Sequence, residues 1–222
     1  MSLVHLVREP AGEAEGALIL NHGRGTDERD LHTLLELLDP GRRLLGVTPG
    51  APLTDIPPGG RHWYRVPRVG YPDPETFHGS YRLLTGFLDE MLESRGIPWQ
   101  RAVIGGFSMG AVMSYAVALG EGRPSPAAIV ALSGFIPTVE GWSAELEGRE
   151  GLPVFIHHGR DDPVMEVGFG RAASETLKRG GLDVTYVETD AGHWVPPELL
   201  PQVEELVASV VPAEHDEDER RR

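Results

Sequence analysis

The sequence contains no cysteine. This absence excludes disulfide bonds, thiolate metal sites and a cysteine nucleophile. The chain also lacks any apolar run close to the roughly 20 residues that a membrane-spanning helix needs. Residues 1–8 lack the basic stretch followed by an apolar stretch that is typical of a secretion signal. We therefore expect a protein of the cytoplasm that does not insert stably into a membrane.

Basic residues are scarce as well. Lysine and arginine together number 20 against 34 aspartates and glutamates, which gives a net charge of −14. A chain with this charge is repelled by nucleic acid and by anionic lipid, so neither is expected as a partner. Small acyl compounds stay open as ligands. A homodimer stays open too, because nothing in the composition decides the oligomeric state.

The length of 222 residues and the hydrophobic fraction of 40% are ordinary for one globular domain with a large core. No linker divides the chain, so we expect a single domain over residues 1–211. Residues 212–222 hold five acidic residues, three arginines and no large apolar side chain. This composition predicts a disordered, charged tail.

Apolar runs of strand length alternate with stretches of helical periodicity. Strands are predicted at residues 2–8, 16–21, 43–47, 102–106, 127–132, 152–158 and 183–188. Helices are predicted around Leu31–Leu38 and at residues 75–95, 109–119, 166–179 and 197–211. The alternation predicts an α/β protein with a mostly parallel, doubly wound sheet of about seven strands and helices on both faces.

Gly106-Phe107-Ser108-Met109-Gly110 lies between an apolar run and an alanine-rich helix former. A strand that turns directly into a helix at a serine puts the hydroxyl on a sharp bend, clear of the sheet. Glycines two residues to either side let the strand and the helix pass closely. The pattern predicts a nucleophile elbow at Ser108, the alternative being a glycine-rich turn with an idle serine.

A serine nucleophile needs a base, which follows the serine and an acid along the chain in folds of this kind. Of the nine histidines, only His193 and His215 follow Ser108 with room for an acid between. His215 belongs to the charged tail. His193 comes directly after the last predicted strand and is the expected base; the alternative is a loop histidine without a role.

The acid is expected at the carboxyl end of a strand, where the loops of an open parallel sheet gather. The strand at residues 152–158 leads into Asp161 and Asp162, which meet this requirement. Asp183 would begin its strand at the opposite edge, and Asp190 is only three residues from His193. These arguments favour the pair and leave the choice within it open.

Taken together, four motifs resemble the phospholipase/carboxylesterase family of α/β-hydrolases, which includes the acyl-protein thioesterases. They are His22-Gly23-Arg24-Gly25, Gly106-Phe107-Ser108-Met109-Gly110, His158-Gly159-Arg160-Asp161-Asp162-Pro163 and Gly192-His193. Their order and spacing cover nearly the whole folded chain. The resemblance implies the α/β-hydrolase fold without a large lid domain.

The resemblance also implies roles for several residues. The backbone N–H groups of Arg24 and Met109 would form the oxyanion hole, and the acid immediately before a proline would be Asp162. Proline also restricts the backbone of the residue before it, which limits where that carboxylate points. The aromatic residues Trp63 and Tyr64 would border the acyl groove, although a tryptophan in a proline-rich loop can equally plug the core.

These inferences predict a serine hydrolase that cleaves carboxylic esters or thioesters of small to medium acyl groups through an acyl-enzyme. Phe135, in the irregular stretch after residue 132, would line the groove or pin the loop. The predicted mechanism uses no metal and no cofactor. The alternatives are a lysophospholipase, an acyltransferase with the same residues, or a non-catalytic protein that binds a small acyl ligand; a pure binder would have no use for a complete Ser108, Asp162 and His193 set.

Overall fold

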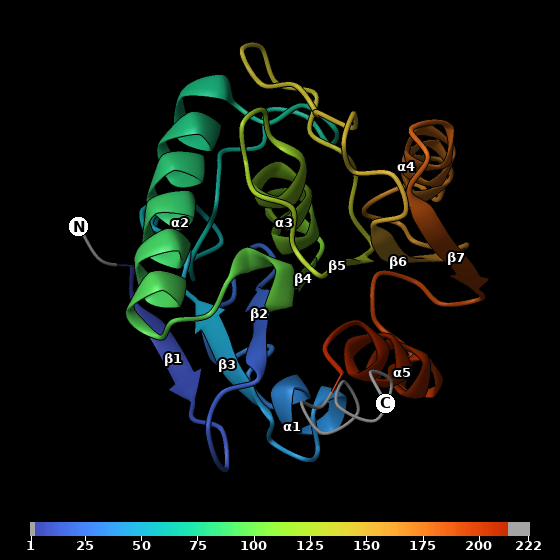
Figure 1. Ribbon diagram of the computed structural model, residues 1–222. Helices are drawn as coiled ribbons and strands as arrows, with labels where there is room; N and C mark the ends of the chain where they lie inside the picture. Colours follow the sequence, from blue (N-terminus) through green and yellow to red (C-terminus); the bar gives the residue numbers. More distant parts are fainter. Residues whose placement is uncertain (1–2, 213–222) are drawn as a thin grey trace.

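The computed structural model describes residues 3–212 (Figure 1), so the predicted tail and His215 lie outside the described residues, apart from Pro212. Seven strands form one sheet in the order β1-β3-β2-β4-β5-β6-β7. The strands are β1 (His5–Arg8), β2 (Gly16–Asn21), β3 (Leu44–Pro49), β4 (Ala102–Phe107), β5 (Ala128–Leu132), β6 (Pro153–Gly159) and β7 (Asp183–Thr189).

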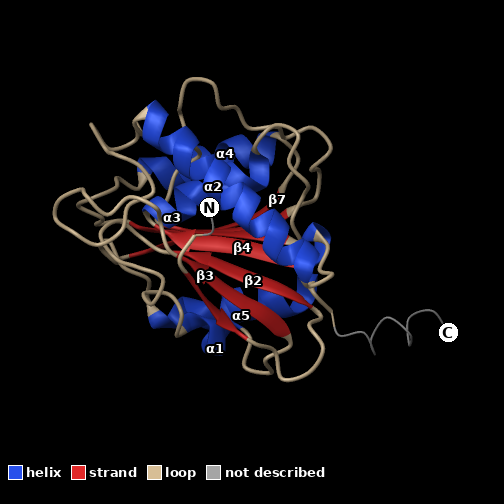
Figure 2. Cartoon of the chain, turned by 90° about the vertical axis from the view of Figure 1, so that its left-hand side faces the viewer, coloured by secondary structure: helices blue, strands red, loops and turns tan. Residues whose placement is uncertain are grey.

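Only β1 runs antiparallel to its neighbour, and the other pairs are parallel. The helices are α1 (Leu34–Leu38), α2 (Pro74–Ser94), α3 (Met109–Leu119), α4 (Gly168–Arg179) and α5 (Leu200–Val210). Figure 2 shows α2, α3 and α4 over one face of the sheet and α1 and α5 over the other. The predicted doubly wound, mostly parallel sheet is confirmed.

Both faces of the central strands are covered, which explains why their sequences are continuous apolar runs. Every residue of β2 and β5 is buried. On one face the strands pack against α2 and α3 in a core that includes Leu84, Leu88 and Val112, whereas Leu35, Val203 and Val207 belong to the core on the α1 and α5 face. The sheet thus separates two apolar layers.

The helix predicted around Leu31–Leu38 is shorter than expected, since α1 covers only Leu34–Leu38. Before it, the backbone forms a series of tight turns. The N–H of Asp30 donates to the carbonyl oxygen of Asp27, and the N–H of Leu34 donates to the carbonyl oxygen of Leu31. The Asp27 side chain also accepts from the backbone N–H of Arg29 at 2.8 Å. Aspartate competes with the helix in this way, because its carboxylate offers the backbone a local turn instead.

A single residue joins β4 to α3. Ser108 has φ 54° and ψ −119°, a left-handed conformation that costs a residue with a side chain of the order of 1–3 kcal/mol. The two flanking glycines are required by close contact with β2: a Cβ atom at Gly106 would lie 2.6 Å from the carbonyl oxygen of Asn21. One at Gly110 would overlap that same oxygen and lie 2.6 Å from the carbonyl oxygen of His22.

Gly110→Ala is therefore expected to destabilise the fold, because backbone atoms of the central sheet cannot move aside. We expect a loss of about 3 kcal/mol, as for severe overpacking, and a fall in Tm of roughly 6–12 °C. Thermal unfolding followed by circular dichroism measures it. Gly86→Ala is the matched control, since Gly86 lies in the exposed face of α2 with open space around it. An equal fall in both variants would refute the steric argument.

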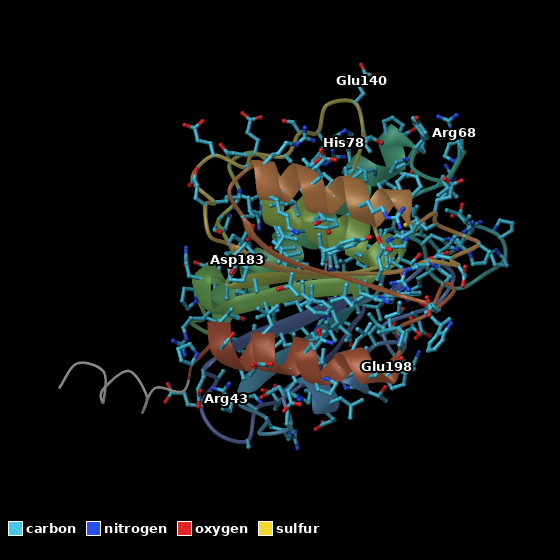
Figure 3. The ribbon with its side chains drawn as sticks, turned by 90° about the vertical axis from the view of Figure 1, so that its right-hand side faces the viewer. Arg43, Arg68, His78, Glu140, Asp183 and Glu198 are labelled. Atoms are coloured by element: carbon cyan, nitrogen blue, oxygen red, sulfur yellow. The ribbon has the colours of Figure 1, made fainter. Side chains whose placement is uncertain are left out.

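The loops that follow the strands gather at one edge of the sheet. Figure 3 shows Arg68, from the loop between β3 and α2, at the end of the molecule opposite Asp183, the first residue of β7. The segments after β2, β4, β6 and β7 reach this same edge because the strands are parallel. The predicted site residues therefore come from segments that the fold brings together.

Candidate active site

The structure joins Ser108, His193 and Asp162 in one chain of hydrogen bonds. Nε2 of His193 lies 2.9 Å from Oγ of Ser108, and its Nδ1 lies 2.6 Å from Oδ2 of Asp162. Ser108 follows β4, Asp162 follows β6 and His193 follows β7. The imidazole therefore bridges the hydroxyl and the carboxylate, which is the geometry needed for proton transfer from the serine.

The Asp162 carboxylate is buried and fixed by its other oxygen. Oδ1 accepts hydrogen bonds from the backbone N–H groups of Val164 and Met165, both at 2.8 Å. Burial raises the pKa of Asp162, but hydrogen bonds from His193 and from these two amides outweigh it and hold the pKa below its usual value. The carboxylate is therefore ionised and faces the imidazole as an anion.

The two alternative acids lie outside this chain. Asp161 is exposed, and Asp190 forms an ion pair with Arg160 at the surface. The Asp190 side chain is 85% exposed and takes no part in the buried hydrogen bonds that join Ser108, His193 and Asp162. Of the aspartates considered from the sequence, only Asp162 contacts His193.

The backbone N–H groups of Arg24 and Met109 are both unused. Neither donates a hydrogen bond within residues 3–212, and both residues line the same cavity as Ser108. Met109 is the first residue of α3, where a backbone N–H has no partner in the helix. Two unpaired donors beside a serine hydroxyl are the arrangement that can hold an oxyanion.

Ser108 and His193 open into a cavity of about 510 Å³. Tyr64 and Phe135, two of the residues predicted for the acyl groove, line it. Its other apolar wall residues are Leu31, Leu34, Val66, Val69, Tyr71, Pro72, Phe107, Met109, Val164, Met165, Trp194 and Val195. Leu31 and Leu34 belong to the core layer under α1 and α5, while Tyr64 and Phe135 belong to the opposite layer. The apolar walls thus come from both faces of the sheet.

The predicted groove residue Trp63 does not line the cavity. Its side chain is fully buried, its indole N–H donates to the carbonyl oxygen of His22 at 3.0 Å, and its ring packs 5.4 Å from the His22 ring. The indole fills the space behind the loop that follows β2, because it is large, flat and has one donor to satisfy. The structure therefore supports the alternative in which Trp63 fills the core and does not border the groove.

The mouth of the cavity is apolar as well. Six large apolar side chains of residues 3–212 are exposed, and four of them, Val69, Tyr71, Val164 and Trp194, line this cavity. The Arg68 guanidinium covers the Tyr71 ring at 3.7 Å from its centre. Sequence reasoning missed these wall residues, although the apolar pair after His193 and the valine after Pro163 directly adjoin the predicted motifs.

No helix within residues 3–212 is long and apolar enough to cross a membrane. Over that same range, no group of three or more histidines and carboxylates is placed to hold a metal ion.

Comparison with known proteins gives the same family as the motifs. The family model for phospholipase/carboxylesterase matches residues 4–211. Acyl-protein thioesterase 1 of Debaryomyces hansenii is 31% identical over 193 residues, which cover 79% of this chain and 82% of that protein. Acyl-protein thioesterase 1 of Candida albicans is 30% identical over an alignment of 230 positions, gaps included, which covers 94% of this chain and 98% of that protein.

The fold is also shared with a solved structure. The carboxylesterase of Bacillus cereus superposes with a TM-score of 0.82 over 94% of each chain, at 21% identity. This likeness concerns the fold alone, and with the family match it confirms the predicted α/β-hydrolase fold. The chain belongs to the phospholipase/carboxylesterase family.

Proposed function

We propose that this protein is a serine hydrolase that cleaves carboxylic esters or thioesters of small to medium acyl groups. The observation that carries the proposal is the hydrogen-bonded chain of Ser108, His193 and Asp162 at the wall of an apolar cavity. The relatives named as thioesterases support the same class of reaction.

In the proposed mechanism, Oγ of Ser108 attacks the carbonyl carbon while Nε2 of His193 takes the hydroxyl proton. The negative charge moves to the carbonyl oxygen, where the N–H groups of Arg24 and Met109 stabilise it; losing one such donor typically costs about 3 kcal/mol of transition-state stabilisation. Asp162 holds the imidazole and stabilises its positive charge.

The tetrahedral intermediate then breaks the bond to the alcohol or thiol, which leaves with the proton that His193 donates. The acyl group stays on Ser108 as an ester. Water attacks this ester, gives a proton to His193, and a second tetrahedral intermediate releases the acid and restores the serine hydroxyl. Every proton and leaving group is thus handled by the three side chains.

The apolar cavity supports acyl groups as the substrates. Its volume of about 510 Å³ lies in the range of small-molecule sites, which are mostly apolar with a few placed polar groups. The open, apolar mouth leaves room for a chain to extend toward solvent. A pure acyl-binding protein is disfavoured, because it would need neither the buried carboxylate nor the unpaired amides.

His193→Ala is expected to lower kcat for ester hydrolysis by about 10³ or more, because the serine then has no base. The measurement uses p-nitrophenyl esters of two to twelve carbons and a palmitoyl thioester. Lysophosphatidylcholine and an added alcohol acceptor test the lysophospholipase and acyltransferase alternatives. Near-normal turnover by a folded His193→Ala variant, or no activity of the wild type on the ester series, would contradict the proposal.

A homodimer stays an open alternative, and a location in the cytoplasm stays a prediction from the sequence. Size-exclusion chromatography with light scattering checks the first of them.

A further inference from the structure

The peptide between Gly23 and Arg24 carries two groups that face opposite ways. A trans peptide is planar, so its C=O and its N–H point in opposite directions. The carbonyl belongs to Gly23, and the N–H is the unused donor of Arg24, a residue that lines the cavity. Any contact that fixes the direction of the Gly23 carbonyl therefore fixes the direction of the Arg24 N–H.

The Gly23 carbonyl oxygen accepts from two side chains. Nδ1 of His22 lies 2.7 Å from it, and the Thr26 hydroxyl lies 3.0 Å from it. The hydroxyl also lies 3.1 Å from Oδ2 of Asp30, so its single proton is shared between two acceptors. Nδ1 of His22 also lies 3.1 Å from Oγ1 of Thr26, but its contact with the Gly23 carbonyl is the shortest of these, so the histidine is the main donor to this carbonyl.

The tautomer of His22 follows from its other nitrogen. Nε2 accepts a hydrogen bond from the backbone N–H of Ala51 at 3.0 Å, and an amide N–H can only donate. Nε2 thus carries no proton, and Nδ1 must carry the proton and donate to Gly23. Burial lowers the pKa of His22, against the opposing effects of the Gly23 carbonyl and of the carboxylates of Asp30, Asp27 and Glu28, which keeps the imidazole neutral.

The rest of the loop is held by other bonds. The Gly25 N–H donates to the Arg61 carbonyl at 3.0 Å, and the Arg61 N–H donates to the Thr26 carbonyl at 2.7 Å. The His22 carbonyl accepts from the Trp63 indole. Between these fixed points, the Gly23–Arg24 peptide is held by the side chains of His22 and Thr26. Glycine at position 23 restricts the backbone rotation of this peptide little.

We propose that His22 is a positioning residue that aims the Arg24 N–H at the oxyanion, with Thr26 as its support. The side chain is 1% exposed and does not line the cavity, so it acts through the peptide and not on the substrate. This inference rests on the proposed function. It assigns a role in catalysis to a histidine outside the Ser108, His193 and Asp162 chain.

The first test compares two replacements of His22. His22→Asn keeps an N–H near the position of Nδ1. His22→Leu removes the donor and puts an apolar side chain of similar size in its place. We expect His22→Leu to lose 10- to 100-fold in kcat with KM changed less than threefold, since removing a whole donor costs about 10²–10³. We expect His22→Asn to recover most of kcat.

A spectroscopic measurement separates positioning from general damage. A trifluoromethyl ketone with a ¹³C-enriched carbonyl adds to Ser108, and ¹³C NMR reports the pKa of the resulting hemiketal oxygen. We expect that pKa to rise by one to two units in His22→Leu and to stay near the wild-type value in His22→Asn. His157→Asn is the control: His157 is also fully buried but bonds to Thr189, and its hemiketal pKa should not change.

Unchanged kcat and hemiketal pKa in a folded His22→Leu variant would overturn the inference. If that variant does not fold, Thr26→Val and Thr26→Ser replace it, because the first keeps the shape and removes the hydroxyl while the second keeps the hydroxyl. Equal hemiketal pKa values in Thr26→Val and Thr26→Ser would then refute the claim that the Thr26 hydroxyl helps to orient the Gly23–Arg24 peptide. A wild type that neither hydrolyses esters nor adds the ketone would instead refute the proposed function.

Discussion

Ser108→Ala is expected to lower kcat/KM for ester hydrolysis by about 10⁵ or more. Oγ of Ser108 lies at the wall of the cavity, 2.9 Å from Nε2 of His193, and is placed to act as the nucleophile. Alanine carries a Cβ atom as serine does, so the backbone conformation at the bend costs the same in the variant. The cavity and the two unpaired amides stay in place. The residual rate would then reflect binding and oxyanion stabilisation alone. The measurement is hydrolysis of p-nitrophenyl butyrate, together with labelling by a fluorophosphonate probe.

Ser133→Ala is a close control for this experiment. Ser133 follows β5, is fully buried and also has a positive φ, of 53°. Its hydroxyl has no hydrogen-bond partner within residues 3–212, and it does not line the cavity. We expect this variant to keep both hydrolysis and the label on Ser108. A label that survives Ser108→Ala would show that the nucleophile lies elsewhere.

The strand–serine–helix bend could be predicted from sequence because its requirements are local. Gly106 and Gly110 are needed because the backbone of β2 passes too close for a Cβ atom at either position. The sequence also shows an apolar run before them and an alanine-rich run after them. The central strands were predictable for a similar reason, since strands such as β2 and β5 are buried along their whole length and have continuous apolar sequences. The chain order of serine, acid and histidine then limited the candidates for the base and the acid to a few residues.

The wall of the cavity could not be predicted in the same way. Its residues come from loops and from both core layers, and the direction of a side chain in a loop depends on contacts that are distant in sequence. Trp63 illustrates this: its neighbour Tyr64 reaches the cavity, while its own indole turns inward to the His22 carbonyl. The short α1 has a comparable origin, because the turn preference of Asp27 competes with the leucine periodicity.

Asp161 and Asp162 are adjacent, yet the structure gives them different surroundings. Oδ2 of Asp162 contacts His193, and Oδ1 accepts from the backbone N–H groups of Val164 and Met165. Asp161 is exposed. In Asp162→Asn, two amides still need an acceptor, so the side-chain oxygen has to stay where Oδ1 lies. The new NH₂ group must then face Nδ1 of His193.

An NH₂ group in that position donates to Nδ1 and therefore moves the imidazole proton to Nε2, where it blocks transfer from Ser108. We expect Asp162→Asn to cost up to about 10⁴ in kcat through this change of tautomer, with little change in fold. Asp161→Asn, the same substitution one residue earlier, should leave kcat within about twofold. Steady-state kinetics on one ester decides between them: a larger loss in Asp161→Asn would reverse the assignment. If neither variant loses activity, Asp162 is not the acid, and Asp190→Asn is the next variant to measure.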